Sequence, residues 1–329
     1  MRRNLLNAKK QHTALRAGLL VFASFLIILL CLISGQQLLN PFTLDQETLN
    51  TLLALRLPRV IVAFLMGGAL GASGAVLQGI FRSPLADPYI LGISSGAALL
   101  VASGLLFGIN LFSLTVPALS FAGAVATGGL VVLLGRGWHG LQPERLLLAG
   151  IGVGFFLSAT LMLLMTIASN DGLKQAFLWM SGDLSMVDFG AVPFGLFFIL
   201  IGLALAFYHH KGLNALTLGD EVAYSLGFNP VSERLWLFMA ASLMTAAAVS
   251  MGGVVGFIGL VVPHIVRRHI GSDAKTVLPL SVVSGGTLLC LADTLGRTVA
   301  APLELPSGVV AAFIGAPYFI FLLQRKQNR

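Results

Sequence analysis

KGLNALTLGDEVAYSLGFNPVSER, residues 211–234, is the longest polar stretch of the chain away from its N-terminus. Long apolar segments lie on both sides of it. Apolar residues recur through the stretch at helical spacing, two acidic residues lie near its middle, and Gly219 and Gly227 interrupt it. This pattern predicts two short amphipathic helices joined by glycine, with Pro230 ending the second. Such a pair is either a solvated loop on the bilayer surface or a docking platform for a soluble partner.

The composition indicates an integral membrane protein. Of the 329 residues, 57% are hydrophobic and 10% are charged, whereas a soluble domain carries about 25% charged residues. The apolar segments do not alternate with polar residues, so they predict helices and not a transmembrane β-barrel. We therefore expect an all-α membrane protein, one domain over residues 1–329. Its net charge of +7 comes from basic residues at span ends, which favours membrane topology over nucleic-acid binding.

A helical span needs about 20 apolar residues, which leaves room for roughly ten. Ten spans are predicted, at about residues 15–34, 58–81, 89–108, 114–135, 145–169, 190–208, 235–253, 255–270, 276–297 and 308–323. The break between the seventh and eighth, near Gly252 and Gly253, is the least marked. The first span follows a basic N-terminus, as a signal peptide would, but no small-residue cleavage site follows it, so we interpret it as a retained span.

The basic residues orient these spans. With ten spans both termini share a side, and that side holds 16 of the 20 Lys and Arg residues. By the positive-inside rule it is cytoplasmic, and it includes residues 211–234. The four exceptions on the outer side are Arg56, Arg59, Lys174 and Arg297.

Catalytic and metal-binding motifs are missing from the sequence. The dipeptide Gly-Lys never occurs, so there is no phosphate-binding loop of the G-x-x-x-x-G-K-[ST] type. Cys31 and Cys290 each lie alone in an apolar run. We interpret His209 and His210 as part of an interfacial basic cluster. His264 is expected to make a local hydrogen bond, to the backbone or between helices. We therefore expect no catalytic residue, no metal site and no cofactor on this chain.

Ionisable residues within the spans are scarce. Asp293 precedes Arg297 by four residues, which predicts an ion pair on one helix face. A carrier driven by a proton or sodium gradient usually needs polar coordination at mid-membrane, and no chain of carboxylates supplies it. An inert membrane anchor is the other class to consider, but Pro263 and Pro317 interrupt spans in a way that an anchor does not need. A pore powered from elsewhere therefore fits best, and it favours the docking platform.

Glycine is abundant in the spans at small-xxx-small spacing, which allows close packing of helices in lipid. The pairs are Gly67/Gly71, Gly92/Gly96, Gly150/Gly154 and Gly252/Gly256. We interpret them as packing positions in preference to gates.

Several motifs, in this order and at these spacings, carry a family resemblance. They are LRLPR (55–59), GGALGASGAVLQ (67–78), SPLADP (83–88) with Leu91-Gly92, RLLLAG (145–150), LTLG (216–219), GFIGLVVPH (256–264), and LPSG (305–308) with Gly315-Ala316-Pro317. The chain resembles the permease subunits of type II ABC importers, the iron-siderophore, haem and vitamin B12 permeases, over nearly its whole length.

The resemblance implies a ten-helix subunit with a vitamin B12 permease-like fold in the inner membrane. It would pair with a second copy, two cytoplasmic ATPase subunits and an extracytoplasmic binding protein. ATP and Mg would then be held by the ATPases, and this chain would not be an enzyme.

The resemblance also implies that about residues 214–228 form coupling helices that dock into a groove of the ATPases. The implied coupling residues are Leu216, Leu218, Gly219, Asp220, Glu221, Val222, Leu226 and Gly227. The two acids would pair with basic groups of the ATPase.

Two further sites are implied at the ends of the pathway. Arg56, Arg59 and Arg297 match positions that face acids of the binding protein, with lipid phosphate as the alternative partner. A cytoplasmic gate would include Ser83, Leu85, Pro143 and Glu144. The last two depart from the small hydroxyl residues of the vitamin B12 permease, and they equally suit the start of a helix.

The implied cargo is a metal chelate. Ferric siderophore is the first expectation, then haem, then vitamin B12, with a molybdate-type oxyanion as a more distant alternative. Selectivity would rest largely on the separate binding protein.

Overall fold

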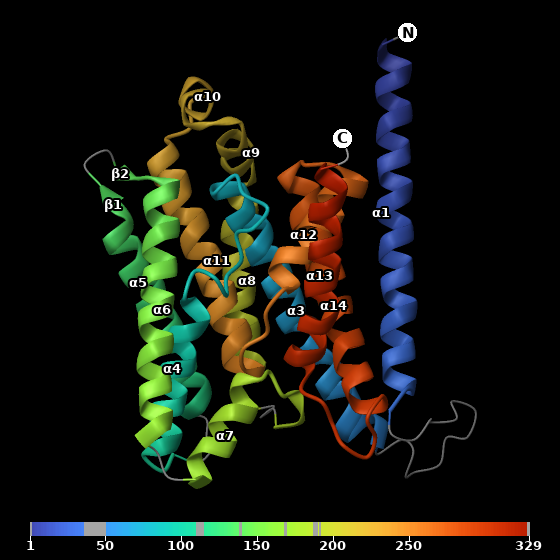
Figure 1. Ribbon diagram of the computed structural model, residues 1–329. Coiled ribbons are helices and arrows are strands. Elements are labelled where there is room, and N and C mark those ends of the chain that lie inside the picture. Colours follow the sequence, from blue (N-terminus) through green and yellow to red (C-terminus); the bar gives the residue numbers. More distant parts are fainter. Residues whose placement is uncertain are drawn as a thin grey trace.

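The computed structural model describes residues 2–35, 51–109, 115–137, 140–167, 170–186, 190 and 192–327. Its long helices stand side by side as a bundle (Figure 1). These helices are α1 (Arg2–Ile33), α3 (Leu57–Ile80), α4 (Ile93–Leu106), α5 (Thr115–Gly135), α6 (Pro143–Ile167), α8 (Val192–Tyr208), α11 (Pro230–Gly252), α12 (Ile258–Ile270), α13 (Ala274–Thr298) and α14 (Ser307–Gln327).

Shorter elements lie at the two ends of the bundle. They are a π-helical turn (Thr51–Arg56), α7 (Asn170–Met180), a 3-10 turn (Leu184–Met186), α9 (His210–Leu218), α10 (Asp220–Ser225) and the strands β1 (Arg136–Gly137) and β2 (Gly140–Leu141). The strands form an antiparallel hairpin in which Arg136 lies opposite Leu141. Sequence reasoning predicted neither the hairpin nor α7.

The all-helical membrane class is confirmed, and each predicted span contains one helix. Six helices, α1, α3, α5, α6, α11 and α13, are each long and apolar enough to cross a membrane. The α8 helix passes the same test only together with α9, from which it is bent by 57°. The α4 and α12 helices are too short for it, and so is Ser307–Phe321, the part of α14 whose side chains are described. Among the described residues, length and composition therefore support six or seven full crossings, fewer than the ten predicted.

The α3 helix is the centre of the bundle, and glycine allows this position. Most of its residues are buried, and it packs on α11, α12 and α13. A Cβ atom on Gly67 would overlap the carbonyl oxygen of Gly285, and one on Gly74 would overlap the backbone of Gly259. These helices therefore touch through their backbones, which confirms the packing role predicted for Gly67.

Helix boundaries around α11 follow local chemistry. Asn229 accepts hydrogen bonds from the backbone of Val231 and Ser232, and Pro230 is the first residue of the helix. Pro230 thus starts α11, which corrects the prediction that it ends the preceding helix. At the other end α11 stops at Gly252, and Gly253 has a φ of +80°. The weakly marked break predicted at this point is confirmed.

Both ends of the chain lie at the end of the bundle that carries α9, α10 and the hairpin, whereas α7 lies at the opposite end (Figure 1). The α1 helix stands at the side of the bundle, where Arg16 donates to the carbonyl oxygen of His269 at 3.2 Å. The side chains of the terminal basic residues before residue 15 and after residue 321 lie outside the described part of the chain.

Candidate functional site

The predicted pair of short helices is present as α9 and α10. Gly219 joins them with a φ of +118°, and Gly227 follows α10 with a φ of +86°. Residues with a Cβ rarely adopt such angles, so glycine is what allows the two bends. Asn214 ties α9 to the start of α13, because its side chain donates to Asp273 and accepts from the backbone of Ala274, each at 2.8 Å.

One face of this pair is apolar and exposed. Leu218 is 66% exposed, Tyr224 76% and Leu226 58%, and Val222 is also exposed. Leu216 is buried inside the bundle, so the expectation that it enters a groove of the ATPase is corrected. Tyr224 was not predicted, because a tyrosine in a polar stretch gives no sign of which way it faces.

A buried arginine holds α10 in place. Arg234 on α11 is 1% exposed, and its Nη2 donates to both carboxylate oxygens of Asp220 at 2.7 and 2.9 Å. Its Nη1 donates to the carbonyl oxygen of Leu141 in β2. We call this three-residue contact the Arg234 clamp. It joins α10, α11 and the hairpin. Asp220 is 42% exposed in this contact, so its pairing with a basic group of the ATPase stays a prediction.

The clamp lies close to both predicted gate loops. Asp220 is 3.9 Å from Arg82, the neighbour of Ser83, and Arg82 holds a φ of +50° that is unusual for a residue with a side chain. Ser83 accepts a hydrogen bond from the backbone of Leu85 at 3.3 Å, and Leu85 is exposed.

The second predicted gate loop begins a helix. Pro143 is the buried first residue of α6, and Glu144 is exposed in its first turn. This is the helix-start alternative, in which an acid is favoured by the helix dipole. The clamp residue Leu141 lies two positions before Pro143. A gate role for this loop stays a prediction.

A polar bracket fastens α3 to α12 at the same end. Arg267 donates to the side chain of Gln78 and, at 2.7 Å, to the carbonyl oxygen of Ala75. Gln78 donates in turn to the carbonyl oxygens of Gly259 at 3.1 Å and Leu260 at 3.0 Å. Sequence reasoning missed this bracket, because Gln78 and Arg267 lie 189 positions apart.

A hollow of about 470 Å³ lies between α4, α6, α14 and the segment that precedes α12. Its lining mixes apolar side chains with hydroxyl groups from Ser94, Ser95, Ser158 and Ser181. Ser95 on α4 and Ser158 on α6 hydrogen-bond to each other at 3.2 Å. Hydroxyl groups gathered at membrane depth are typical of a path for polar cargo.

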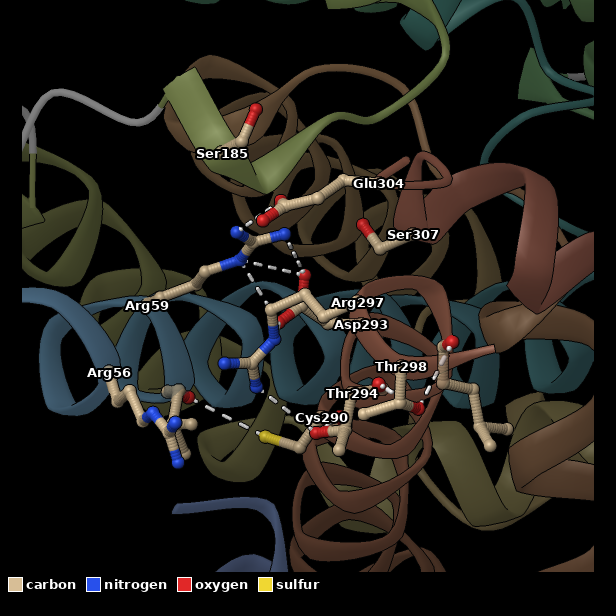
Figure 2. A network of polar contacts seen from close by, with 12 residues as sticks. Arg56, Arg59, Ser185, Cys290, Asp293, Thr294, Arg297, Thr298, Glu304 and Ser307 are labelled. Carbon is tan, nitrogen blue, oxygen red and sulfur yellow. Dashed lines mark hydrogen bonds and ion pairs between the residues drawn. The ribbon is translucent and has the colours of Figure 1, made fainter. Parts of the chain in front are cut away.

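The opposite end of the bundle carries a network of ion pairs (Figure 2). Arg59 on α3 contacts the buried Asp293 on α13 at 2.9 Å and Glu304 at 2.8 Å. Asp293 also pairs with Arg297 at 3.1 Å, which confirms the predicted pair on one helix face. The roles of Arg59 and Glu304 in the network were not predicted, since the three elements meet only in the fold.

The three outer arginines are thus engaged within the chain. Arg56 is buried and donates to the carbonyl oxygens of Leu32 and Ile33 at the end of α1. Arg297 is buried and donates to Thr294. Arg59 is the one whose partner Glu304 is partly exposed. Docking of a partner on these arginines stays a prediction, and Arg59 is the best placed for it.

The histidine and cysteine predictions concern local contacts. His209 lies directly after α8, where its Nδ1 is 2.8 Å from Glu233 and its ring stacks on Trp236. It therefore contacts α11, which sequence reasoning did not predict. Cys31 and Cys290 are buried and free. Among the described residues, no three His, Cys, Asp or Glu side chains gather as a metal would require.

Comparison with known proteins decides the family. The FecCD transport family matches residues 18–325. The chain belongs to the FecCD transport family. It is 38% identical over 326 residues to the hemin transport system permease protein of Yersinia pestis, with 94% of this chain and 97% of the relative covered. The Fe(3+) dicitrate transport system permease protein of Escherichia coli (strain K12) is 37% identical over 288 residues, with 88% and 89% covered.

A solved structure described as an inward-facing conformation of a metal-chelate type ABC transporter has the same fold, with a TM-score of 0.81. It is 27% identical and covers 94% of this chain and 99% of its own. The predicted resemblance is therefore confirmed: the chain is a FecCD permease subunit of an ABC importer, a transport component without catalysis of its own. Such a permease works with an ATPase and a binding protein.

The clamp makes a prediction about α10 and the hairpin. Asp220→Asn removes the charge that neutralises Arg234. Removing one partner of a fully buried ion pair lowers the free energy of unfolding by about 3 kcal/mol or more, and the loss is smaller here because Asp220 is half exposed. We expect a lower thermal midpoint of the purified permease and faster backbone hydrogen exchange at residues 140–141. Glu221→Gln, which changes the exposed neighbouring acid, is the control. Equal exchange in both variants would contradict the clamp.

Proposed function

We propose that this chain and a second copy of it form the membrane pathway of an importer for an iron chelate, which is either haem or a ferric siderophore. Two ATPase subunits would dock on α9 and α10, and a binding protein would dock at the end that carries Arg59. The observation that carries this proposal is the exposed apolar face of α9 and α10, held to the bundle by the Arg234 clamp.

The face suits a helix-in-groove contact with the ATPase. Leu218, Val222, Tyr224 and Leu226 supply apolar surface, and the exposed Glu221 is available for a basic group. In this proposal, movement of the ATPase pulls α10, and the clamp passes the movement to α11 and, through Leu141, to the start of α6. Since the chain ends share this side of the bundle, both termini would be cytoplasmic in the inner membrane.

The hydroxyl-lined hollow supports a pathway on the face formed by α4, α6 and α14. Four serines line it, and such groups are poorly suited to lipid. The exposed apolar residues of α6, among them Phe155, Phe156 and Met162, offer surface for the second copy. A homodimer would then enclose the hollow on its axis.

An iron chelate is the cargo that best fits both the family and the chain. The two relatives above are named for haemin and for ferric dicitrate, and both compounds are iron chelates. The described residues offer no gathered metal ligands, which suits a cargo that passes with its metal fully enclosed. Cobalamin is the alternative within the same family.

Reconstituted uptake tests the proposal. Vesicles holding the permease with its ATPase would be given the binding protein and labelled haem, ferric siderophore, cobalamin or molybdate, with and without ATP inside. We expect ATP-dependent uptake of haem or ferric siderophore. Uptake of cobalamin or molybdate alone would contradict the cargo. Uptake driven by a proton gradient without ATP would contradict the power source.

Docking of the binding protein on Arg59 requires that one of its carboxylates replaces Glu304. Arg59→Glu should weaken capture of the binding protein at least about tenfold at low ionic strength, with a smaller effect as salt rises. Lys174→Glu, which reverses an exposed charge on α7 at the same end, is the matched control. Equal losses in both variants would show general attraction and would contradict a specific Arg59 contact. Capture would be measured by surface plasmon resonance.

A further inference from the structure

A long apolar groove runs along the outside of the bundle, away from the hollow and from the docking face. It has a volume of about 960 Å³ and lies between α5 and α8, with α11 as its floor. Its walls are almost entirely apolar. The exceptions to this are Ser242 at its floor and a group of Arg136, Tyr208 and Trp236 at one end.

The groove has the length of one leaflet of a bilayer. Along α5 its lining runs from Val125 to the end of the helix, with Arg136 directly after it, which at about 1.5 Å per residue is roughly 16 Å. The hydrocarbon core of a bilayer is about 30 Å thick, so half of it is about 15 Å. The end with Arg136 is the one that carries the hairpin and α9 (Figure 1).

A cluster of aromatic side chains follows the groove at the end away from Arg136. Phe121 of α5 lies one turn beyond Val125, and it packs on Phe194 and Phe198 of α8 with ring centres 5.2 and 4.4 Å apart. A membrane-spanning helix of a partner, or of a second copy, would need a groove that continues past this point. The phenylalanine cluster at this end therefore favours an occupant one leaflet long.

The open end carries positive charge and interfacial aromatic residues. Arg136 is exposed, and no ion pair involves it in the described part of the chain. The guanidinium of Arg145 lies against Gly137, the residue after Arg136. Tyr208 and Trp236 line the groove at the same end as Arg136, and such rings are common at the level of lipid headgroups. This end thus offers Arg136 to a negatively charged headgroup.

Small residues keep the groove open. A Cβ on Gly129 would meet no atom within 4 Å, and Ala204 faces the same space from α8. Larger side chains would fit there without disturbing the helices. Gly129 and Ala204 therefore leave space between α5 and α8 that larger side chains would fill.

We propose that this groove binds one anionic phospholipid of the cytoplasmic leaflet. Its acyl chains lie between α5 and α8 up to the phenylalanine cluster, and its phosphate contacts Arg136. Basic pockets between helices on the cytoplasmic side are suited to anionic headgroups. The lipid bridges α5 and α8 over α11, the helix that carries Arg234. The proposal does not depend on the identity of the imported cargo.

Lipid retention tests the site in the purified full chain. After delipidation, the protein would be titrated with phosphatidylglycerol or phosphatidylcholine, and bound lipid would be counted by native mass spectrometry. We expect one tightly retained phosphatidylglycerol per chain. Gly129→Leu fills this space in the groove and should lose it, whereas Gly18→Leu, the same change at an exposed position of α1, should keep it.

The headgroup contact has its own test. Arg136→Gln should reduce the preference for phosphatidylglycerol over phosphatidylcholine by about tenfold, while Arg268→Gln, at an exposed arginine of α12, should leave it unchanged. Equal retention in Gly129→Leu and Gly18→Leu would overturn the proposal. So would a stoichiometric polypeptide that stays in the groove, or a disulfide between two copies that each carry Gly129→Cys.

Discussion

Backbone atoms of α12 and α13 lie directly against glycines of α3, and this contact fixes the rest of the molecule. In lipid no hydrophobic force drives helices together, so close backbone approach supplies the packing. A side chain at Gly67 or Gly74 would collide with a backbone and not with a flexible side chain. The α3 helix consequently holds a fixed position, with Arg59 near its N-terminal end and Arg82 just beyond its C-terminal end. One rigid helix therefore joins the two candidate docking regions.

Each candidate docking region contains an arginine–aspartate ion pair in which one partner is fully buried. Arg234 is buried against Asp220 at one end, and Asp293 is buried against Arg59 and Arg297 at the other. Burying charges is costly, so such pairs add little to stability when a well-packed apolar alternative exists. What they do provide is a unique geometry. The fork of Arg234 determines which way α10 faces, and its contact with Leu141 relates that orientation to the start of α6.

The sequence predicted the helical class, the order of the helices and the pair of short helices, because these follow from local composition. Glycine at positions 219 and 227 indicated where that pair would bend, and the motif order indicated the family. Contacts between distant segments could not be predicted. The ion pair between Asp220 and Arg234 was not predicted, since nothing in the sequence around Asp220 shows that Arg234 would reach it. The burial of Leu216 and the exposure of Tyr224 were missed for the same reason. Helical spacing gives the two faces of a short helix, but not which face is buried. Glu304 lies in a connection with no regular pattern, so its pairing with Arg59 left no trace in the sequence.

The central claim is that the Arg234 clamp moves α10 and the start of α6 as one body. Spin labels at Tyr224 and Glu144, both exposed, would report their separation in one labelled copy of the assembled importer. A second sample with Glu144 labelled in both copies would report the opening between them. Double electron–electron resonance with and without a non-hydrolysable ATP analogue should show an unchanged Tyr224–Glu144 distance and a shifted Glu144–Glu144 distance. A Tyr224–Glu144 distance that changes with nucleotide, while the distance between the copies stays constant, would contradict the account.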